Sequence, residues 1–159
     1  MLGSYVWDFT AVPNAGTALW GSVPEHLRRA STTWMPLAVV GYFLFTYLLL
    51  FRLRPEETRI ARRFGFAAFN WIYALILFPS ALWMPLSIWA LENPGAAQVW
   101  AVRLTLWIVG LASLLLIGAL LALRPRRPAI AYGLAVAGSI AFAVQTVVMD
   151  AALWVAYFP

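Results

Sequence analysis

The chain has 159 residues, 64% of them hydrophobic and only 11% charged, and its net charge is +5. Because a soluble domain carries about 25% charged residues, this composition excludes an ordinary soluble protein and indicates an integral membrane protein. The lack of cysteine and the single histidine, His26, exclude thiolate metal sites and bis-histidine haem, so we expect neither a metal nor a cofactor.

Residues 1–33 contain no apolar run long enough to cross a bilayer. Trp7, Phe9 and Trp20 alternate there with turn residues, and the basic start and apolar core of a cleavable signal peptide are missing. Since tryptophan concentrates at the headgroup level of membranes, we predict a non-spanning, interfacial segment that lies on the membrane surface or folds over the helices. A disordered tail is the alternative.

Residues 34–159 form the second predicted unit, an all-α domain of four transmembrane helices. A spanning helix needs roughly 20 apolar residues, and the predicted spans are residues 34–51, 64–91, 98–123 and 129–158. Pro36 would stand in the first turn of the first span, where its missing N–H costs nothing. We therefore predict a four-helix bundle in contact with the lipid bilayer.

The positive charge predicts how this bundle is oriented. Eight of the eleven basic residues fall in two short loops: Arg52, Arg54, Arg59, Arg62, Arg63, Arg124, Arg126 and Arg127. Because cytoplasmic loops are enriched in basic residues, we predict a bacterial inner (cytoplasmic) membrane with both termini outside; only Arg28 and Arg29 oppose this orientation. The arginines offer no folded basic face, so we expect no nucleic-acid partner.

The second span carries polar side chains along one helical face. Its members are spaced by alternating steps of three and four, and they are Asn70, Tyr73, Leu77, Ser80, Met84 and Ser87. Such a face suits a helix that lines a cavity or contacts a partner helix. Pro79, near the midplane, frees a backbone carbonyl and is a candidate hinge.

The third span is rich in leucine and suits a lipid-facing position, whereas the fourth is rich in small residues. Gly133, Ala137 and Ala141 recur at every fourth position, and such a small-residue ridge lets another helix approach closely. We therefore predict a helix-packing role for these three residues, in the bundle centre or at a dimer seam.

Two ionisable residues, Arg103 and Asp150, lie inside apolar spans, where they are functional-site candidates by default. Both fall in the outer part of their spans, so one hypothesis is a direct ion pair. The alternatives are mutual neutralisation without a further role, or an Arg103 side chain that extends to the headgroups. Ser139, Thr146, Asp150 and Trp154 follow helical spacing with Gln145 beside them, so one face of the fourth helix is polar.

These features predict an outward-opening pocket that is mostly apolar with a few polar groups, as small-molecule sites are. The predicted ligand-binding residues are Trp83, Ser87, Arg103, Trp107, Thr146, Asp150 and Trp154. For the tryptophans near the outer interface, Trp89, Trp100 and Trp154, the alternative is an aromatic belt that needs no ligand.

Residues 34–158 also resemble the TspO family of tryptophan-rich sensory or translocator membrane proteins. The segment from Trp34 to Pro36 resembles that family's Trp-x-Pro-Pro, Asn70-Trp71 resembles its Asn-Trp-x-Trp-Pro, and Trp154 closes the last span in a comparable place. The resemblance implies a dimer that binds a flat apolar ligand, such as a porphyrin or a sterol. The chain departs from the family in its four predicted spans rather than five, in Tyr73 for the second tryptophan and in Asp150 for an asparagine.

The sequence thus predicts a non-catalytic membrane protein that binds an apolar small molecule or a lipid. No phosphate-binding loop, histidine-based triad or metal-ligand spacing indicates an enzyme. One alternative is a structural or accessory subunit of a larger membrane complex. Another is a small oligomeric transporter, with Pro79 as its hinge and Asp150 as its coupling carboxylate.

Overall fold

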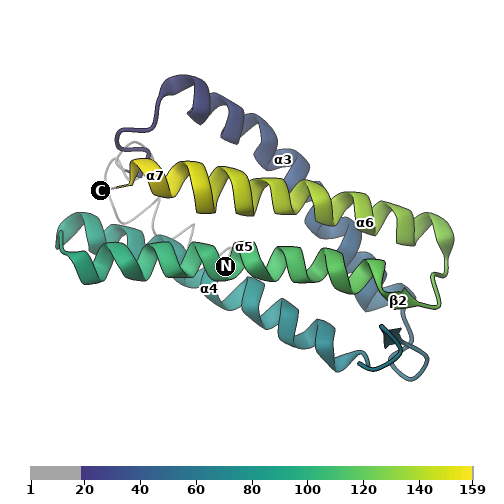
Figure 1. The fold of residues 1–159 in the computed structure, drawn as a ribbon. Helices are drawn as coiled ribbons and strands as arrows, with labels where there is room; N and C mark the ends of the chain where they lie inside the picture. The colour runs from purple at the N-terminus through teal and green to yellow at the C-terminus, as the bar shows by residue number, and fades with distance from the viewer. Residues whose placement is uncertain (1–18, 159) are drawn as a thin grey trace.

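The computed structural model describes residues 19–158, and four of its helices are long and apolar enough to cross a membrane. These spans are Glu25–Arg52, Ala67–Glu92, Ala96–Leu121 and Ala129–Tyr157. They begin with α3 (Glu25–Tyr47), α4 (Ala67–Glu92), α5 (Ala96–Leu121) and α6 (Ala129–Ala143) in turn. A π-helical turn, η1 (Leu48–Arg52), extends α3, while the π-helix η2 (Val144–Trp154) and the short α7 (Val155–Tyr157) extend α6. Successive helices run in opposite directions (Figure 1), so the predicted all-α, four-helix bundle is confirmed.

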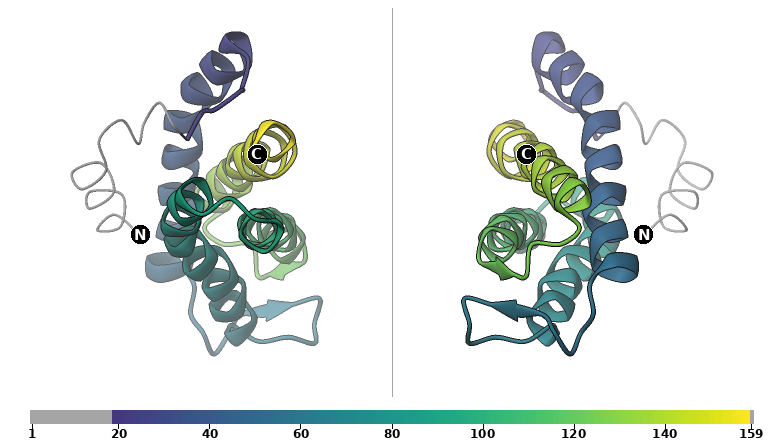
Figure 2. Two further views of the ribbon diagram at one scale, coloured as in Figure 1. Left: turned by 90° about the vertical axis from the view of Figure 1, so that its left-hand side faces the viewer. Right: turned by 90° about the vertical axis from the view of Figure 1, so that its right-hand side faces the viewer.

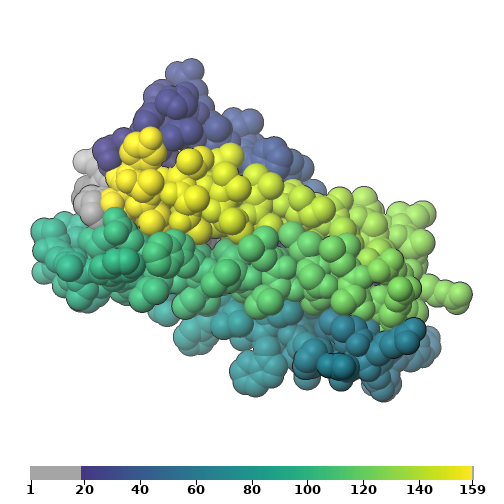
Figure 3. Space-filling view, viewed as in Figure 1, coloured from purple at the N-terminus to yellow at the C-terminus, as the bar shows by residue number. Residues whose placement is uncertain are grey.

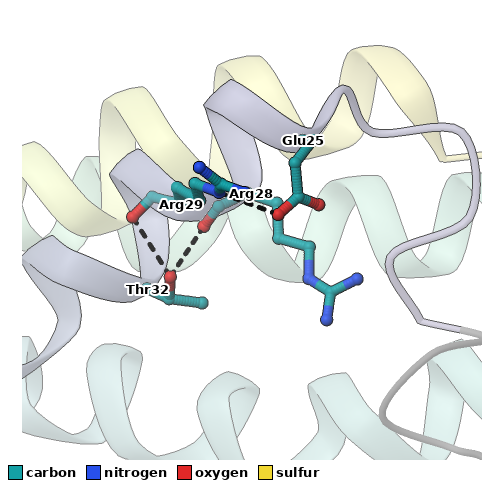
Figure 4. Close-up of polar contacts among 4 residues, drawn as sticks. All are labelled: Glu25, Arg28, Arg29 and Thr32. Carbon is teal, nitrogen blue, oxygen red and sulfur yellow. Dashed lines mark hydrogen bonds and ion pairs between the residues drawn. The ribbon is translucent and has the colours of Figure 1, made fainter.

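The first helix begins at Glu25 and not at Trp34, the predicted start of the first span. Its polar first turns have local support, since the Arg29 Nε donates to the Glu25 carboxylate at 2.9 Å (Figure 4), and such pairs four residues apart stabilise helices. The Thr32 hydroxyl lies within hydrogen-bonding distance of the carbonyls of Arg28 and Arg29. The rest of the predicted interfacial segment, residues 1–18, lies outside the described residues.

Pro36 therefore stands inside α3, and its predicted place in a first turn is wrong. Proline lacks the N–H that the preceding turn needs, and its ring crowds that turn, so a helix bends there. Figure 2 shows the first turns of α3 leaning away from the remainder of the helix.

The bundle is built from two closely packed helix pairs, α3 with α6 and α4 with α5. The pairs meet where α5 contacts α6 and η2, and Figure 3 shows the final helix lying directly along α5 on this face. The α3–α6 contact is closest where Gly41 faces Gly138. A Cβ added at Gly138 would lie 2.9 Å from the Gly41 Cα, and one added at Gly41 would collide with the Gly138 carbonyl, so both positions require glycine.

Two of the three residues of the predicted small-residue ridge in the fourth span face outward, whereas Ala141 is half-buried and its carbonyl accepts from the Trp34 indole of α3. Gly133 and Ala137 are exposed, and a Cβ added at Gly133 would meet nothing within 4 Å. Gly138 follows Gly133 by five residues, which places it about 140° further round a helix of 3.6 residues per turn. Gly133 and Ala137 therefore do not pack in the bundle centre, whereas use of the ridge at a dimer seam stays a prediction.

The main apolar core occupies the half of the bundle near the arginine-rich loops. It is formed by side chains from all four helices and the adjoining segments, with these fully buried members: Phe45, Leu48, Phe69, Ile76, Leu116, Leu120 and Leu123.

A short antiparallel pairing, which the sequence did not predict, joins the two arginine-rich loops. Strand β1 (Arg59–Ile60) lies beside β2 (Leu123–Arg124), with Ile60 opposite Leu123 and Arg59 opposite Arg124. Successive side chains of a strand point to opposite faces, so the apolar pair is buried and the arginine pair is exposed. The pairing gathers the arginine-rich loops at one end of the bundle, opposite the α4–α5 turn (Figure 1).

Candidate functional site

Polar residues gather inside the bundle where the last helix becomes the π-helix η2. In a π-helix each N–H bonds to the carbonyl five residues back, and such segments frequently mark functional sites. The η2 segment is 11 residues long and contains Gln145, Thr146 and Asp150. Neither proline nor glycine occurs in it, so the familiar sequence signs of an irregular helix are missing.

Gln145 connects α3 to the far turn of η2. Its Nε2 donates to the Ser31 Oγ at 3.2 Å and to the Asp150 Oδ1 at 2.9 Å. Gln145 and Asp150 are five residues apart, which stacks them on successive turns of a π-helix. We call Ser31, Gln145 and Asp150 the polar cluster.

One acceptor in the polar cluster has no partner. The Gln145 side chain is only 6% exposed, and its Oε1 is buried without a hydrogen bond among the described residues. The amide turns its nitrogen toward the Asp150 carboxyl group, where it donates, and its oxygen therefore points away. An unpaired buried acceptor costs about 1–3 kcal/mol, so the cluster is incomplete without a donor.

Asp150 is also sparsely paired. Within residues 19–158, Gln145 is the only hydrogen-bond donor to its partly buried carboxylate, and the carboxylate takes part in no ion pair. A charge held away from water needs several hydrogen bonds or an opposite charge to offset its lost hydration. The polar cluster therefore offers two acceptor groups, an amide oxygen and a carboxyl group, to a donating or cationic group.

The polar cluster lies close to the end of the bundle that carries the start of α3 and the C-terminal turn. Ser31 follows Glu25 by six residues, which is about 9 Å along a helix. The charged turn in Figure 4, with Glu25, Arg28 and Arg29, directly precedes it. A ligand entering from that end would have to pass only about two helical turns.

A hydrogen-bonded pair of hydroxyls comes from Thr146 of η2, which follows Gln145 in the sequence, and Ser113 of α5. The Thr146 Oγ1 donates to the Ser113 Oγ at 2.9 Å, and the Ser113 hydroxyl donates to the carbonyl of Gly110 at 2.7 Å. Thr146 and Ser113 are both buried. Since both hydroxyls donate a hydrogen bond within the protein, we assign this pair to packing between α5 and η2.

The predicted pocket residues Trp83 and Trp154 pack in one apolar cluster, and Ser87 is buried one turn after Trp83 on α4. The Trp83 and Trp154 rings meet edge to face at 5.7 Å, and Trp154 stacks on Phe158 at 4.4 Å. The indole N–H of Trp154 donates to the carbonyl of Leu19, and the Ser87 hydroxyl donates to the carbonyl of Trp83 within its own helix. These contacts explain the three residues as packing.

Two further predicted pocket residues, Arg103 and Trp107, lie on α5 beside Trp100. The Arg103 guanidinium sits 5.6 Å from the ring of Trp100, which meets the Trp107 ring at 5.9 Å. Trp107 is 39% exposed, and its indole N–H donates to the carbonyl of Ala151. Among the described residues Arg103 forms no ion pair with Asp150. Its guanidinium lies over Trp100, one turn nearer the start of α5, while its Nε is buried without a hydrogen-bond partner in that part of the chain.

The polar stripe predicted on α4 faces inward only in part. Ser87 and Met84 are buried, but Asn70 is exposed, as is the neighbouring Trp71 of the motif that resembles the TspO family. The Tyr73 hydroxyl lies 2.6 Å from the Thr46 hydroxyl of α3. The helix runs unbroken through Pro79 and Pro85, and Pro79 stays a candidate hinge.

The structure thus distributes the seven predicted pocket residues over four groups. Of these residues, only Asp150 belongs to the polar cluster. Gln145 was expected on the polar face, but Ser31 and Ser113 were not singled out, because single serines carry no sequence signal. Ser31 also lies in the segment that was predicted not to span the membrane.

No group of three or more histidine, cysteine or acidic residues that could hold a metal ion occurs in the described part of the chain. Comparison with known protein families, characterised proteins and solved structures found no significant match. The resemblance to the TspO family stays a prediction that these comparisons do not test.

Proposed function

We propose that the chain is an integral membrane protein of the cytoplasmic-membrane type, with the arginine-rich loops inside and both termini outside. Two features support this topology. Four helices have the length and apolarity of spans, and eight arginines gather at the end of the bundle where β1 pairs with β2. Basic loops of this kind stay on the cytoplasmic side.

The function we propose is non-catalytic binding of a small apolar molecule that carries a hydrogen-bond donor, in the strongest case an ammonium group. The observation that supports it is the unpaired Gln145 Oε1 in the polar cluster, beside the Asp150 carboxylate. A ligand ammonium or hydroxyl could donate to both oxygens. Ionisable residues inside spans commonly mark ligand or ion sites, and Asp150 is the one carboxylate in the cluster.

A matched pair of probes tests this proposal. We would titrate the purified protein with 1-adamantylamine and with 1-adamantanecarboxylate, which share an apolar body and differ in the charge and donor capacity of the attached group. The amine should bind, while the carboxylate should bind at least tenfold more weakly, because about 1.4 kcal/mol of lost interaction already gives that factor.

Variants locate the binding site. Asp150→Asn and Gln145→Leu should each weaken binding of the amine by tenfold or more. Thr146→Val should leave the affinity unchanged, because the Thr146 hydroxyl already bonds to Ser113. Equal affinity for the two probes, or unchanged amine binding in Asp150→Asn, would show that the polar cluster is not the site.

The outward ridge of α6 supports a second candidate, an accessory subunit of a larger membrane complex. Gly133 and Ala137 are exposed, with open space where a Gly133 side chain would be, and small residues of this spacing suit a partner helix. Gly133→Leu should then break assembly, while Gly118→Leu should not; Gly118 is an exposed glycine of α5 that also has open space around it. If both variants behave as the wild type in size-exclusion chromatography, the subunit hypothesis fails.

The transporter hypothesis keeps its candidate hinge, because Pro79 stands inside α4 and an internal proline bends a helix. Its coupling carboxylate, Asp150, stays available for it. Ion-dependent uptake into vesicles that is lost in Asp150→Asn would support transport in place of simple binding.

A further inference from the structure

Two adjoining hollows lie at the arginine-rich end of the bundle, and Arg52 and Pro128 line both of them. The first, of about 530 Å³, lies between the end of α3 and the start of α6. Apart from Arg52 its lining is apolar: Leu44, Tyr47, Pro128, Ala129, Ile130 and Leu134, with Ala131. The second, of about 600 Å³, lies over the two loops and is lined by Arg52, Arg54, Arg127 and Glu57, among others.

The apolar hollow opens on the outer surface of the bundle. Ile130 is 81% exposed, and Tyr47 and Leu134 are 48% and 47% exposed. In the proposed membrane orientation these side chains face the acyl chains of the inner leaflet. A lipid chain could lie along this hollow without displacing any buried side chain.

The second, basic hollow has an excess of positive charge. Its three arginines are opposed by one carboxylate, Glu57, which accepts from Arg54 at 3.2 Å. The Arg52 guanidinium lies 5.9 Å from the Tyr47 ring, and neither the Arg52 nor the Arg127 side chain has a hydrogen bond or an ion pair within the described part of the chain. By contrast, Arg59 and Arg126 in the same loops donate to backbone carbonyls.

We propose that the two hollows together bind one anionic phospholipid of the inner leaflet, with an acyl chain along the apolar hollow and the phosphate between Arg52 and Arg127. Arginine suits this role because its planar guanidinium can bind phosphate oxygens in pairs. Basic pockets beside transmembrane helices on the cytoplasmic side are a recognised setting for lipid headgroups. A free phosphate would leave the apolar hollow unused, so the combination favours a lipid.

This inference goes beyond the proposed function and uses different residues at the opposite end of the bundle. It depends on insertion in the membrane but not on ligand binding at the polar cluster. Failure at one site would therefore leave the other proposal standing.

The test is native mass spectrometry of the full chain released from vesicles of equal parts phosphatidylglycerol and phosphatidylcholine. The wild type should retain phosphatidylglycerol preferentially. The double variant Arg52→Gln with Arg127→Gln should retain phosphatidylglycerol roughly 30-fold more weakly, because each arginine near an anionic headgroup contributes about fivefold. The matched control, Arg62→Gln with Arg63→Gln, removes the same charge from the β1 turn and should keep the preference.

A second variant pair tests the apolar hollow without touching an arginine. Leu134→Trp should fill the hollow and reduce retention of both lipids, whereas Leu115→Trp, on an exposed position of α5, should not. The proposal is overturned if the wild type retains the two lipids equally, if the control arginine pair loses the preference as fully, or if Leu134→Trp changes nothing. Displacement of the lipid by inorganic phosphate alone would indicate a phosphate site and would also overturn it.

Discussion

Gln145 is the residue on which the polar cluster depends, because one amide holds α3 through Ser31 and supplies the only donor to Asp150 among residues 19–158. Its own oxygen is left without a partner. A side chain selected only for packing would not need to leave a buried acceptor unpaired, and a buried polar network that is partly satisfied is costly. Binding of a donor is the explanation we favour for that cost.

Gln145→Leu should therefore destabilise the protein more than Thr146→Val does. The leucine leaves the Asp150 carboxylate without its donor, and hydrogen bonds to charged groups contribute about 1.5–3 kcal/mol. Thr146→Val removes one neutral contact between helices, which contributes about 0.6 kcal/mol on average in membrane proteins. Unfolding by a denaturing detergent in mixed micelles measures both; equal losses would show that Asp150 does not rely on the amide.

Leu123 anchors β2, because its side chain is fully buried in the main apolar core while that of its neighbour Arg124 faces outward. Leu123→Ala should cost about 2–5 kcal/mol of stability, as for other fully buried leucines. Leu121→Ala, two positions earlier and 51% exposed, is the matched control and should cost far less. If the two variants unfold alike in the same detergent titration, the β1–β2 pairing does not anchor the loops.

Among the elements, the contact of α3 with α6 has the strictest steric requirement. Gly41 and Gly138 face each other without room for a Cβ on either, and close backbone approach of this kind is a common way for membrane helices to associate. The Trp34 indole adds a hydrogen bond of 2.9 Å to the carbonyl of Ala141 on the same interface.

Gly138→Ala should accordingly destabilise the protein by about 1–3 kcal/mol, the usual cost of overpacking. Gly133→Ala, on the open face of the same helix, should be neutral or stabilising by up to about 1 kcal/mol, because alanine favours helix. Detergent-induced unfolding of the two variants checks this contrast. A larger loss for Gly133→Ala would mean that the outward ridge, and not Gly138, carries the packing.

The elements also show how far sequence reasoning extends. Apolar length alone predicted the four helices, because a run near 20 residues has few other uses. The start of α3 was missed since Glu25 and Arg29 look like a loop in a hydropathy profile, although they suit a helix. The packing glycine was misplaced because Gly133 and Gly138 both belong to small-residue patterns, and only the neighbouring helix distinguishes them.

The candidate site was predicted less well than the fold. Asp150 is recognisable as a carboxyl group in an apolar span. The predicted partner is Arg103, but the observed partner is Gln145, because a π-helical turn brings residues five apart together. A change from α- to π-helix depends on backbone bonding that has no simple residue signature. The tryptophans of the predicted pocket pack on one another and on backbone carbonyls, which composition cannot reveal.

For the whole molecule, the two ends of the bundle have different chemistry. One end gathers eight arginines in two loops joined by β1 and β2. The other end has the polar cluster, the tryptophans of α5 and the turn after Glu92. This asymmetry is the basis for the proposed orientation.

Single cysteines can test the orientation cleanly, because the chain has no cysteine of its own. Asn93→Cys, in the exposed α4–α5 turn, should react with a membrane-impermeant maleimide added to intact cells. Glu56→Cys, in the exposed arginine-rich loop, should react only after the membrane is opened. Labelling in the reverse order would invert the topology and would place the proposed lipid site in the outer leaflet.

One measurement addresses binding at the polar cluster before any ligand is known: native mass spectrometry of the protein released gently from its own membrane. We expect a monomer or dimer that carries a discrete small-molecule mass, and we expect that mass to be absent from the Asp150→Asn protein expressed and released in the same way. Release without any small mass, or an equal mass on Asp150→Asn, would contradict ligand binding at Gln145 and Asp150. Release only within a larger assembly would favour the accessory-subunit function in its place.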